Sequence, residues 1–310
     1  MSLRLLIPGL GVAAALFLVP LSALAWGPVA HLDFAGQLLA GVIPLAPVLM
    51  DLITKHAADF IYGNLAADVI LGKNRARDHD QCHSWEVARK LLVHARLQGP
   101  AAEAFMLGYM AHLGADVVAH NHIVPQMMVI HYRKKGVGHL YWEARADQRL
   151  LDLDPGLVEI WKEVMGRRFY DHDSFLAEEL VPTLFSNKIS ARLYKQGLRM
   201  QRKAVWRRFF RRIDVRSRLL FDQDDLLLWR RLAVVAAHKA IDNPMNAQLD
   251  HLDPTGKAAL KRAAYWRKAL RRKLGNLRRN PSGKLLLAAA YDRALLETRM
   301  VNIKMFDDEV

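Results

Sequence analysis

The sequence Met-Ala-His-Leu-Gly-Ala-Asp-Val-Val-Ala-His-Asn-His, residues 110–122, places polar side chains in an otherwise apolar stretch. His112, Asp116 and His120 are four residues apart, and residues at i and i+4 share one face of an α-helix. Burying such groups without partners is costly. For any one histidine taken alone, a satisfied core position is the simpler interpretation. Three potential ligands in one register favour a metal ion as their common partner.

Helical spacing extends to both sides of this stretch. Between residues 30 and 150, Ala, Leu, Met and Val recur at helical intervals, with turn-forming residues near 78–81, 98–100 and 134–138. The second half has breaks near 154–156, 243–244, 253–256 and 280–283. No run of alternating apolar and polar residues is long enough to indicate a sheet. We therefore predict an all-α fold built as a bundle of many helices.

The first 25 residues have the pattern of a secretory signal peptide. A basic start at Arg4 precedes an apolar stretch, and Ala23 and Ala25 form an A-x-A cleavage site. Cleavage there would make Trp26 the amino terminus of an exported protein, periplasmic or secreted. The alternative is a membrane anchor that is not cleaved, because the apolar run approaches the length of a bilayer span. The single cysteine, Cys82, excludes an intramolecular disulfide.

The chain is strongly basic. Its 45 Lys and Arg exceed its 31 Asp and Glu by 14, and the excess is greatest in residues 195–218 and 257–279. Such a charge favours polyanionic partners, either an anionic membrane surface or nucleic acid, although a solvated basic surface explains it almost as well. Segment 202–216 mixes aromatic residues with arginines, which is typical either of a helix on a membrane surface or of one packed into its own core.

A second group of potential ligands follows the first. His139 and Glu143 are again at i and i+4, and Asp147 lies one turn further on. An imidazole and a carboxylate at this spacing can form half of a zinc site. The alternative is that Glu143 and Asp147 are solvated or pair with Arg145 and Arg149.

Three further candidates lie closer to the amino terminus. Asp68 ends the segment Gly-Asn-Leu-Ala-Ala-Asp, and His83 lies just before an expected helix that begins near Trp85. His31 follows Trp26 by five residues. Each is a weak signal alone.

Together these residues resemble the zinc-dependent phospholipase C family. That family is similar to the trinuclear-zinc single-strand nucleases and to the catalytic domain of glycosylphosphatidylinositol-specific phospholipase D. The resemblance covers residues 26 to about 147. It implies a multi-helix bundle of the phospholipase C and nuclease type, here with a basic helical C-terminal extension. It also implies that the amino nitrogen and carbonyl oxygen of a leading tryptophan chelate a zinc ion.

The resemblance implies up to three zinc ions and a ligand set for each. These sets are Trp26 and His31 for the first; Asp68, His83 and His112 for the second, with Asp116 bridging the two; and His139, Glu143 and either His120 or His122 for the third. The phospholipase C and nuclease members place the last ligand six residues after the bridging aspartate, which selects His122. The phospholipase D-like members place it four residues after, as helical register also does, which selects His120.

The implied activity is hydrolysis of a phosphodiester. A metal-bound hydroxide would attack phosphorus, with the bridging Asp116 holding two zinc ions and Asp68 orienting the attacking water. We therefore predict a zinc-dependent phosphodiesterase that acts on a phospholipid head group. The alternatives are a single-strand nuclease on the same metal frame and a non-catalytic, metal-stabilised, membrane-associated binding protein. The expected organisation is a signal peptide (1–25), a zinc-binding core (26–155) and a basic helical region that completes or extends it (156–310).

Overall fold

The computed structural model describes residues 26–68, 82–133, 139–180, 208, 211, 212, 215, 221–277 and 283–299. Within these ranges every regular element is a helix, and no strand is present. The predicted all-α fold is confirmed. The predicted signal peptide and most of segment 202–216 lie outside the described residues.

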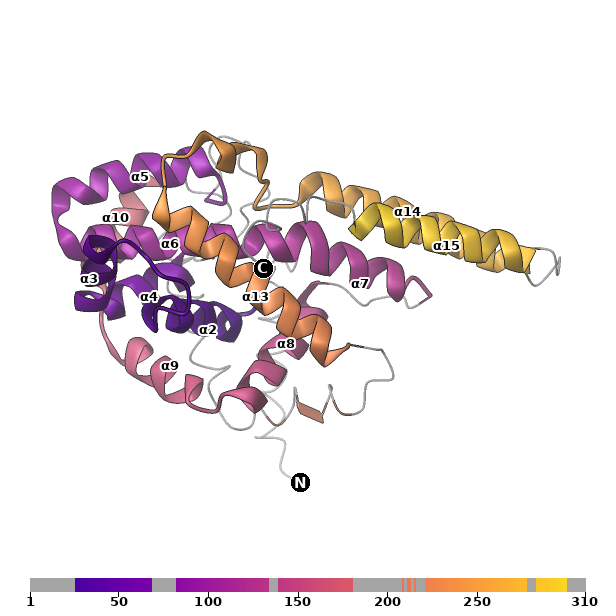
Figure 1. Ribbon diagram of the computed structural model, residues 1–310, viewed down its shortest axis with the longest axis horizontal. Coiled ribbons are helices and arrows are strands. Elements are labelled where there is room, and N and C mark those ends of the chain that lie inside the picture. Colours follow the sequence, from indigo (N-terminus) through magenta and orange to yellow (C-terminus); the bar gives the residue numbers. More distant parts are fainter. Residues whose placement is uncertain are drawn as a thin grey trace, which may run out of the picture.

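Figure 1 shows the helices of the described ranges. In order they are α2 (Pro28–Leu39), α3 (Pro47–Lys55), α4 (Ala57–Ala66), α5 (Trp85–Gln98), α6 (Pro100–Val118), the π-helix η4 (Ala119–Ile123), α7 (Val124–Ile130), α8 (His139–Leu153), α9 (Leu157–Gly166), α10 (Tyr170–Glu179), α13 (Gln223–Asp242), the 3-10 helix η5 (Ala247–His251), α14 (Lys257–Leu277) and α15 (Gly283–Arg299).

Helix α6 is the central element of the body, with α4, α5 and α13 packed around it (Figure 1). Glycines allow the close approach. A Cβ atom on Gly63 of α4 would lie 1.8 Å from the carbonyl oxygen of Phe105, and one on Gly108 of α6 would lie 1.9 Å from that of Phe60. Almost all of α6 is buried as a result, including its polar residues His112 and Asp116. The helix that carries the decisive stretch is therefore enclosed by its neighbours.

The turns predicted from the sequence coincide with helix ends wherever the structure describes them. Ser84 caps α5 by accepting a hydrogen bond from the backbone N–H of Val87 (3.5 Å). Gly99 ends the helix with a φ of 120°, and Pro100 then occupies the first turn of α6. The breaks near 154–156, 243–244 and 253–256 likewise separate helices.

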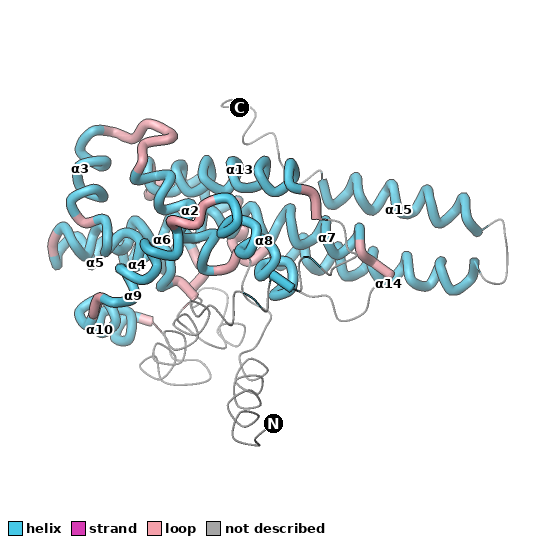
Figure 2. Tube along the Cα trace, turned by 90° about the horizontal axis from the view of Figure 1, so that it is seen from below, coloured by secondary structure: helices cyan, strands magenta, loops and turns pink. Residues whose placement is uncertain are grey.

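Helices α14 and α15 form a hairpin that extends away from the body (Figures 1 and 2). Its inner side packs on α7 through a second apolar cluster that includes Val129, Ala263, Leu270 and Ala294. The hairpin is one part of the region 156–310 for which a basic helical extension is expected. Among the described helices, none combines the length and apolar character that crossing a bilayer requires.

A partly buried ion pair joins α13 to α2. Both oxygens of the Asp33 carboxylate accept hydrogen bonds from the Arg230 guanidinium, each at 2.6 Å, and Gln37 donates a third hydrogen bond at 3.0 Å. Asp33 is buried, so removing the arginine would leave its charge poorly compensated. The pair thus ties a helix of the second half to the first helix of the described chain.

We expect Arg230→Ala to lower the free energy of unfolding by about 2–4 kcal/mol, because it leaves a buried carboxylate without its main partner. The matched control is Arg231→Ala at the neighbouring exposed position, which we expect to cost less than about 0.5 kcal/mol. Urea unfolding followed by circular dichroism measures both. Equal, small losses for the two variants would contradict the role given to the pair.

Candidate metal centre

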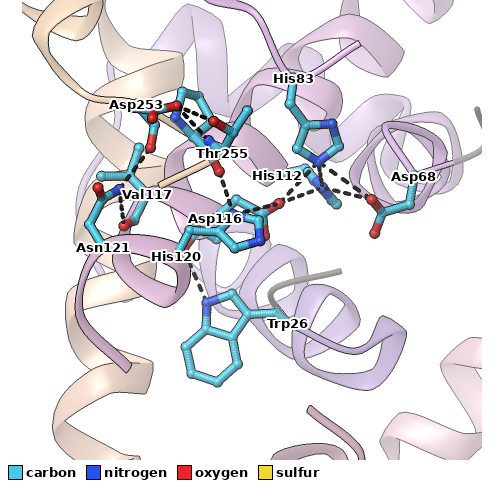
Figure 3. A network of polar contacts seen from close by, with 12 residues as sticks. Trp26, Asp68, His83, His112, Asp116, Val117, His120, Asn121, Asp253 and Thr255 are labelled. Atoms are coloured by element: carbon cyan, nitrogen blue, oxygen red, sulfur yellow. Dashed lines mark hydrogen bonds and ion pairs between the residues drawn. The ribbon is translucent and has the colours of Figure 1, made fainter. Parts of the chain in front are cut away.

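Five predicted ligands from four segments of the chain meet at α6, and Figure 3 labels all of them except His31. His112 and Asp116 lie one turn apart on α6, His31 comes from α2, Asp68 follows the end of α4, and His83 precedes α5. All five side chains are buried. The close packing of α4 and α2 against α6 brings together residues that are far apart in the sequence.

Asp116 lies at the centre of this group. Its Oδ1 is 3.4 Å from His31 Nε2, while its Oδ2 is 3.0 Å from His83 Nε2 and 3.3 Å from His112 Nε2. Asp68 Oδ1 lies 3.4 Å from His83 Nε2 on the far side. The two oxygens of one carboxylate therefore face different sets of imidazoles.

Two overlapping groups of ligand atoms have the compactness of metal sites. One contains His31, His112 and Asp116, and the other contains Asp68, His83 and His112. Within each group the ligand atoms lie no more than 4.8 Å from one another. Imidazole nitrogens and carboxylate oxygens are the ligands that zinc takes in proteins.

The imidazole rings are held with Nε2 towards the centre. His112 Nδ1 lies 2.8 Å from the carbonyl oxygen of Asn64, and His31 Nδ1 lies 3.2 Å from the Asn64 side-chain oxygen. His83 Nδ1 faces Cys82 Sγ at 3.4 Å. A metal-binding histidine typically engages its other ring nitrogen in such a contact, which fixes the ring and its tautomer.

One pair of atoms shows that a cation fits here. Within the described part of the chain, neither His31 Nε2 nor Asp116 Oδ1 has a partner at hydrogen-bonding geometry, although both are buried. Buried polar atoms without partners are uncommon and costly. An ion between the imidazole and the carboxylate would satisfy both atoms, so the residues present fit zinc.

The electrostatics of the centre also favour a cation. Burial alone would raise the pKa of Asp116, but the charge of His112 and contacts with His112, His31 and His83 together hold that pKa well below its usual range. Burial, followed by the nearby His112, lowers the pKa of His31, against the opposing effect of Asp116. A neutral imidazole beside an ionised carboxylate is the protonation state that metal binding requires.

His120 lies at the edge of the group, in the π-helix η4. Its Nδ1 is 4.0 Å from Asp116 Oδ2 and contacts the carbonyl oxygen of Pro254. The neighbouring Asn121 donates hydrogen bonds to the carbonyl oxygens of Val117 (2.9 Å) and Asp253 (2.7 Å), as Figure 3 shows. A π-helix inside a longer helix often marks a functional site.

The turn at residues 253–256 supports η4 from outside. A Cβ atom on Gly256, whose φ is 58°, would lie 2.4 Å from the carbonyl oxygen of His120. The Asp253 carboxylate accepts hydrogen bonds from the backbone N–H groups of Thr255 and Lys257, both at 2.8 Å. This turn is a part of the site that sequence reasoning missed, because 253–256 read only as a helix break.

The remaining predicted ligands are placed less completely. Trp26 is buried, and its indole N–H donates to the carbonyl oxygen of Ala115 at 3.0 Å. Burial lowers the pKa of His122 to about 4, and neither compact ligand group among the described residues contains it. Glu143 is buried on α8 but belongs to neither group, and the side chain of His139 lies outside the described residues.

Asp147 has a role that its sequence position did not reveal. Its carboxylate accepts hydrogen bonds from the backbone N–H groups of Val29 (3.2 Å) and Ala30 (3.0 Å) and so caps α2 from another helix. A Cβ atom on Gly27 would lie 2.1 Å from Asp147 Oδ2, so the position next to Trp26 accepts only glycine without rearrangement. Asp147 is buried, and neither the solvated nor the arginine-paired alternative describes it.

The fold and the site together define a class of protein, in which an all-helical body encloses a cluster of histidines and carboxylates. The chain matches the family model "Zinc dependent phospholipase C" over residues 30–193, more than half of its length. It therefore belongs to the zinc-dependent phospholipase C family, a family name that points to a hydrolase. No curated protein and no solved structure gave a significant match.

We expect the stability of the protein to depend on pH through Asp147. Burial raises its pKa to about 7, against two opposing backbone hydrogen bonds. A carboxyl whose folded pKa is raised binds its proton more tightly in the folded state, so this stability is present below pH 4 and is lost as the pH rises from about 4 to 7. The slope is at most about 1.4 kcal/mol per pH unit.

Unfolding free energies at several pH values, compared between the wild type and Asp147→Asn, measure this effect. The asparagine variant should lose this part of the slope while the contributions of other groups remain. Identical slopes for the two proteins would contradict the assignment.

Proposed function

We propose that this protein is a zinc-dependent phosphodiesterase that releases the head group of a phospholipid. The observation that carries the proposal is the buried Asp116, kept ionised between His31 on one side and His83 and His112 on the other. A carboxylate in this position can bridge two metal ions. Family membership supplies the reaction class, and the pair of compact ligand groups supports two adjacent ions.

The proposed ligands follow the geometry. The first site uses His31 and Asp116, and the second uses Asp68, His83 and His112. For a third site we propose His120 in preference to His122, because His120 lies within 4.0 Å of Asp116 and its contact with the Pro254 carbonyl fixes the ring. That third site would also use His139 and Glu143.

Trp26 enters the first site only if the signal peptide is removed. The indole hydrogen bond to Ala115 holds Trp26 against the turn of α6 that carries Asp116. A free amine there could chelate together with the Trp26 carbonyl oxygen. We accordingly propose export, with cleavage after Ala25. The division into a zinc-binding core (26–155) and a basic helical region (156–310) also remains a proposal.

The roles of the residues follow from their surroundings. Zinc, when bound, supplies Lewis acidity for the phosphoryl oxygens and an activated water for attack at phosphorus. Asp116 contributes a fixed negative charge, because its pKa is held below the working range. Asp68 lies beside His83 in the second group, and its proposed role is to accept a proton from the attacking water. The neutral His31 adds no charge that would repel a cation.

The two alternative functions differ in what they require of this centre. A non-catalytic binding protein needs at most one structural metal, whereas two compact groups are present among the described residues. A single-strand nuclease would use the same centre on a different phosphodiester. Substrate turnover therefore separates the nuclease from the phospholipase.

We expect Asp68→Asn to reduce head-group release from phosphatidylcholine at least about a hundredfold, because it removes a carboxylate beside the reacting centre. The control is Asp59→Asn in the first turn of α4, at the end of that helix away from Asp68, where the carboxylate accepts from His172 instead. Phosphate released after phosphatase treatment measures turnover. The proposal fails if the zinc-loaded wild type releases no head group, and release of nucleotides from single-stranded DNA instead would establish the nuclease.

We expect Gly256→Ala to weaken zinc binding by displacing His120, since the new methyl group would meet the His120 backbone. Gly41→Ala is the matched control: its φ of 66° imposes similar backbone strain, but the nearest atom is Met50 Cε at 3.8 Å. Zinc per chain, determined after dialysis against graded chelator, should fall for Gly256→Ala and not for Gly41→Ala. Equal retention by both variants would contradict the role of this turn.

A further inference from the structure

The outward face of α14 carries a stripe of cations. The helix contains eight Lys and Arg residues and no Asp or Glu. Four exposed cations and one exposed tyrosine follow one another at spacings of four, four, three and four residues: Lys257, Lys261, Tyr265, Lys268 and Arg272. These spacings keep all five on one side of an α-helix. The buried residues Ala263 and Leu270, which face α7, lie on the opposite side.

Apolar side chains accompany this charge. Tyr265, in the middle of the stripe, is 67% exposed. Leu285 and Leu286 are 81% and 63% exposed and lie in the first turn of α15, at the end of the hairpin farthest from the body (Figure 2). Large exposed apolar groups near a basic helix face are typical of proteins that bind at a membrane interface.

We propose that the α14–α15 hairpin is a docking surface for an anionic phospholipid bilayer. Charge complementarity selects an anionic partner, because the stripe has four cations and α14 has no acidic residue. The exposed leucines favour lipid over nucleic acid, whose non-specific binding depends on the cations that neutralise phosphates and on aromatic rings that stack on bases. From Lys257 to Arg272 the stripe extends about 22 Å, enough to contact several head groups.

The position of the stripe links docking to the candidate metal centre. Lys257 directly follows Gly256, where an added Cβ atom would lie 2.4 Å from the carbonyl oxygen of His120. A bilayer lying along α14 would therefore reach the end of the helix that adjoins the centre. This inference deepens the proposed function and rests on it only for the substrate, since lipid binding by the stripe does not require catalysis.

The test is cosedimentation of the zinc-loaded protein with vesicles of phosphatidylcholine alone or with about one third phosphatidylglycerol. Wild type should bind the anionic vesicles, and 0.5 M salt should weaken this binding strongly. Lys261→Gln with Lys268→Gln should weaken it about 30-fold, at about fivefold per cation. The matched control, Lys55→Gln with Lys90→Gln, changes the net charge equally at exposed positions on α3 and α5 and should bind like wild type.

Equal binding by the two double variants would overturn the proposal. The proposal would also be overturned if the stripe variant lost binding to single-stranded DNA but still bound vesicles like the wild type. Leu285→Ser with Leu286→Ser should reduce the vesicle binding that remains in high salt. If that binding is unchanged, the two leucines are not part of the docking surface.

A monomeric short-chain phosphatidylcholine keeps this inference separate from the proposed function. Hydrolysis of that lipid without vesicle binding would overturn the docking surface alone. Vesicle binding without release of any head group would overturn the phospholipase activity alone.

Discussion

The structure depends on keeping one carboxylate ionised in the interior of a helical bundle. Asp116 is fully buried on α6, where desolvation opposes its charge, and it is held charged by three imidazoles. Each imidazole comes from a different segment, so the constraint specifies how α2, α5 and α6 must meet. The glycines that let α4 approach α6 serve the same end, because α4 brings Asn64 to orient two of the rings.

Most of the fold could be predicted from the sequence. Helical periodicity, Gly99-Pro100 and the other turn residues carry local information, and the helices begin and end at those positions. The ligands on α6 could be found as well, since the spacing of His112 and Asp116 is local. Grouping them with His31, Asp68 and His83 needed the family resemblance, because no single-sequence pattern reports contacts across such separations.

What the sequence could not reveal depends on contacts between distant segments. A regular helix predicts His120 in register with Asp116, yet η4 changes the helical period at residue 119. The turn that supports His120 lies more than 130 residues away and outside the segment matched by the family model. Asp147 is similar: α2 lacks a side-chain cap of its own, and nothing near it in the sequence says that α8 supplies one.

The second half of the chain thus contributes to the centre as well as to the surface. Helix α13 supplies the guanidinium that neutralises Asp33 on α2, the helix that also carries His31. The turn before α14 contacts the π-helix, and α14 then extends outward with its cations. A site for a charged, membrane-bound substrate would need both a stable buried centre and an accessible basic surface, and one continuous segment provides a connection between them.

The most direct test of the account is anomalous diffraction at the zinc absorption edge from crystals of the protein purified with zinc. The account predicts two adjacent anomalous peaks, one beside His31 and Asp116 and the other beside Asp68 and His83. An anomalous map with no peak at this cluster, or with zinc peaks only at the protein surface, would contradict the claim that Asp116 and its histidines form a metal centre.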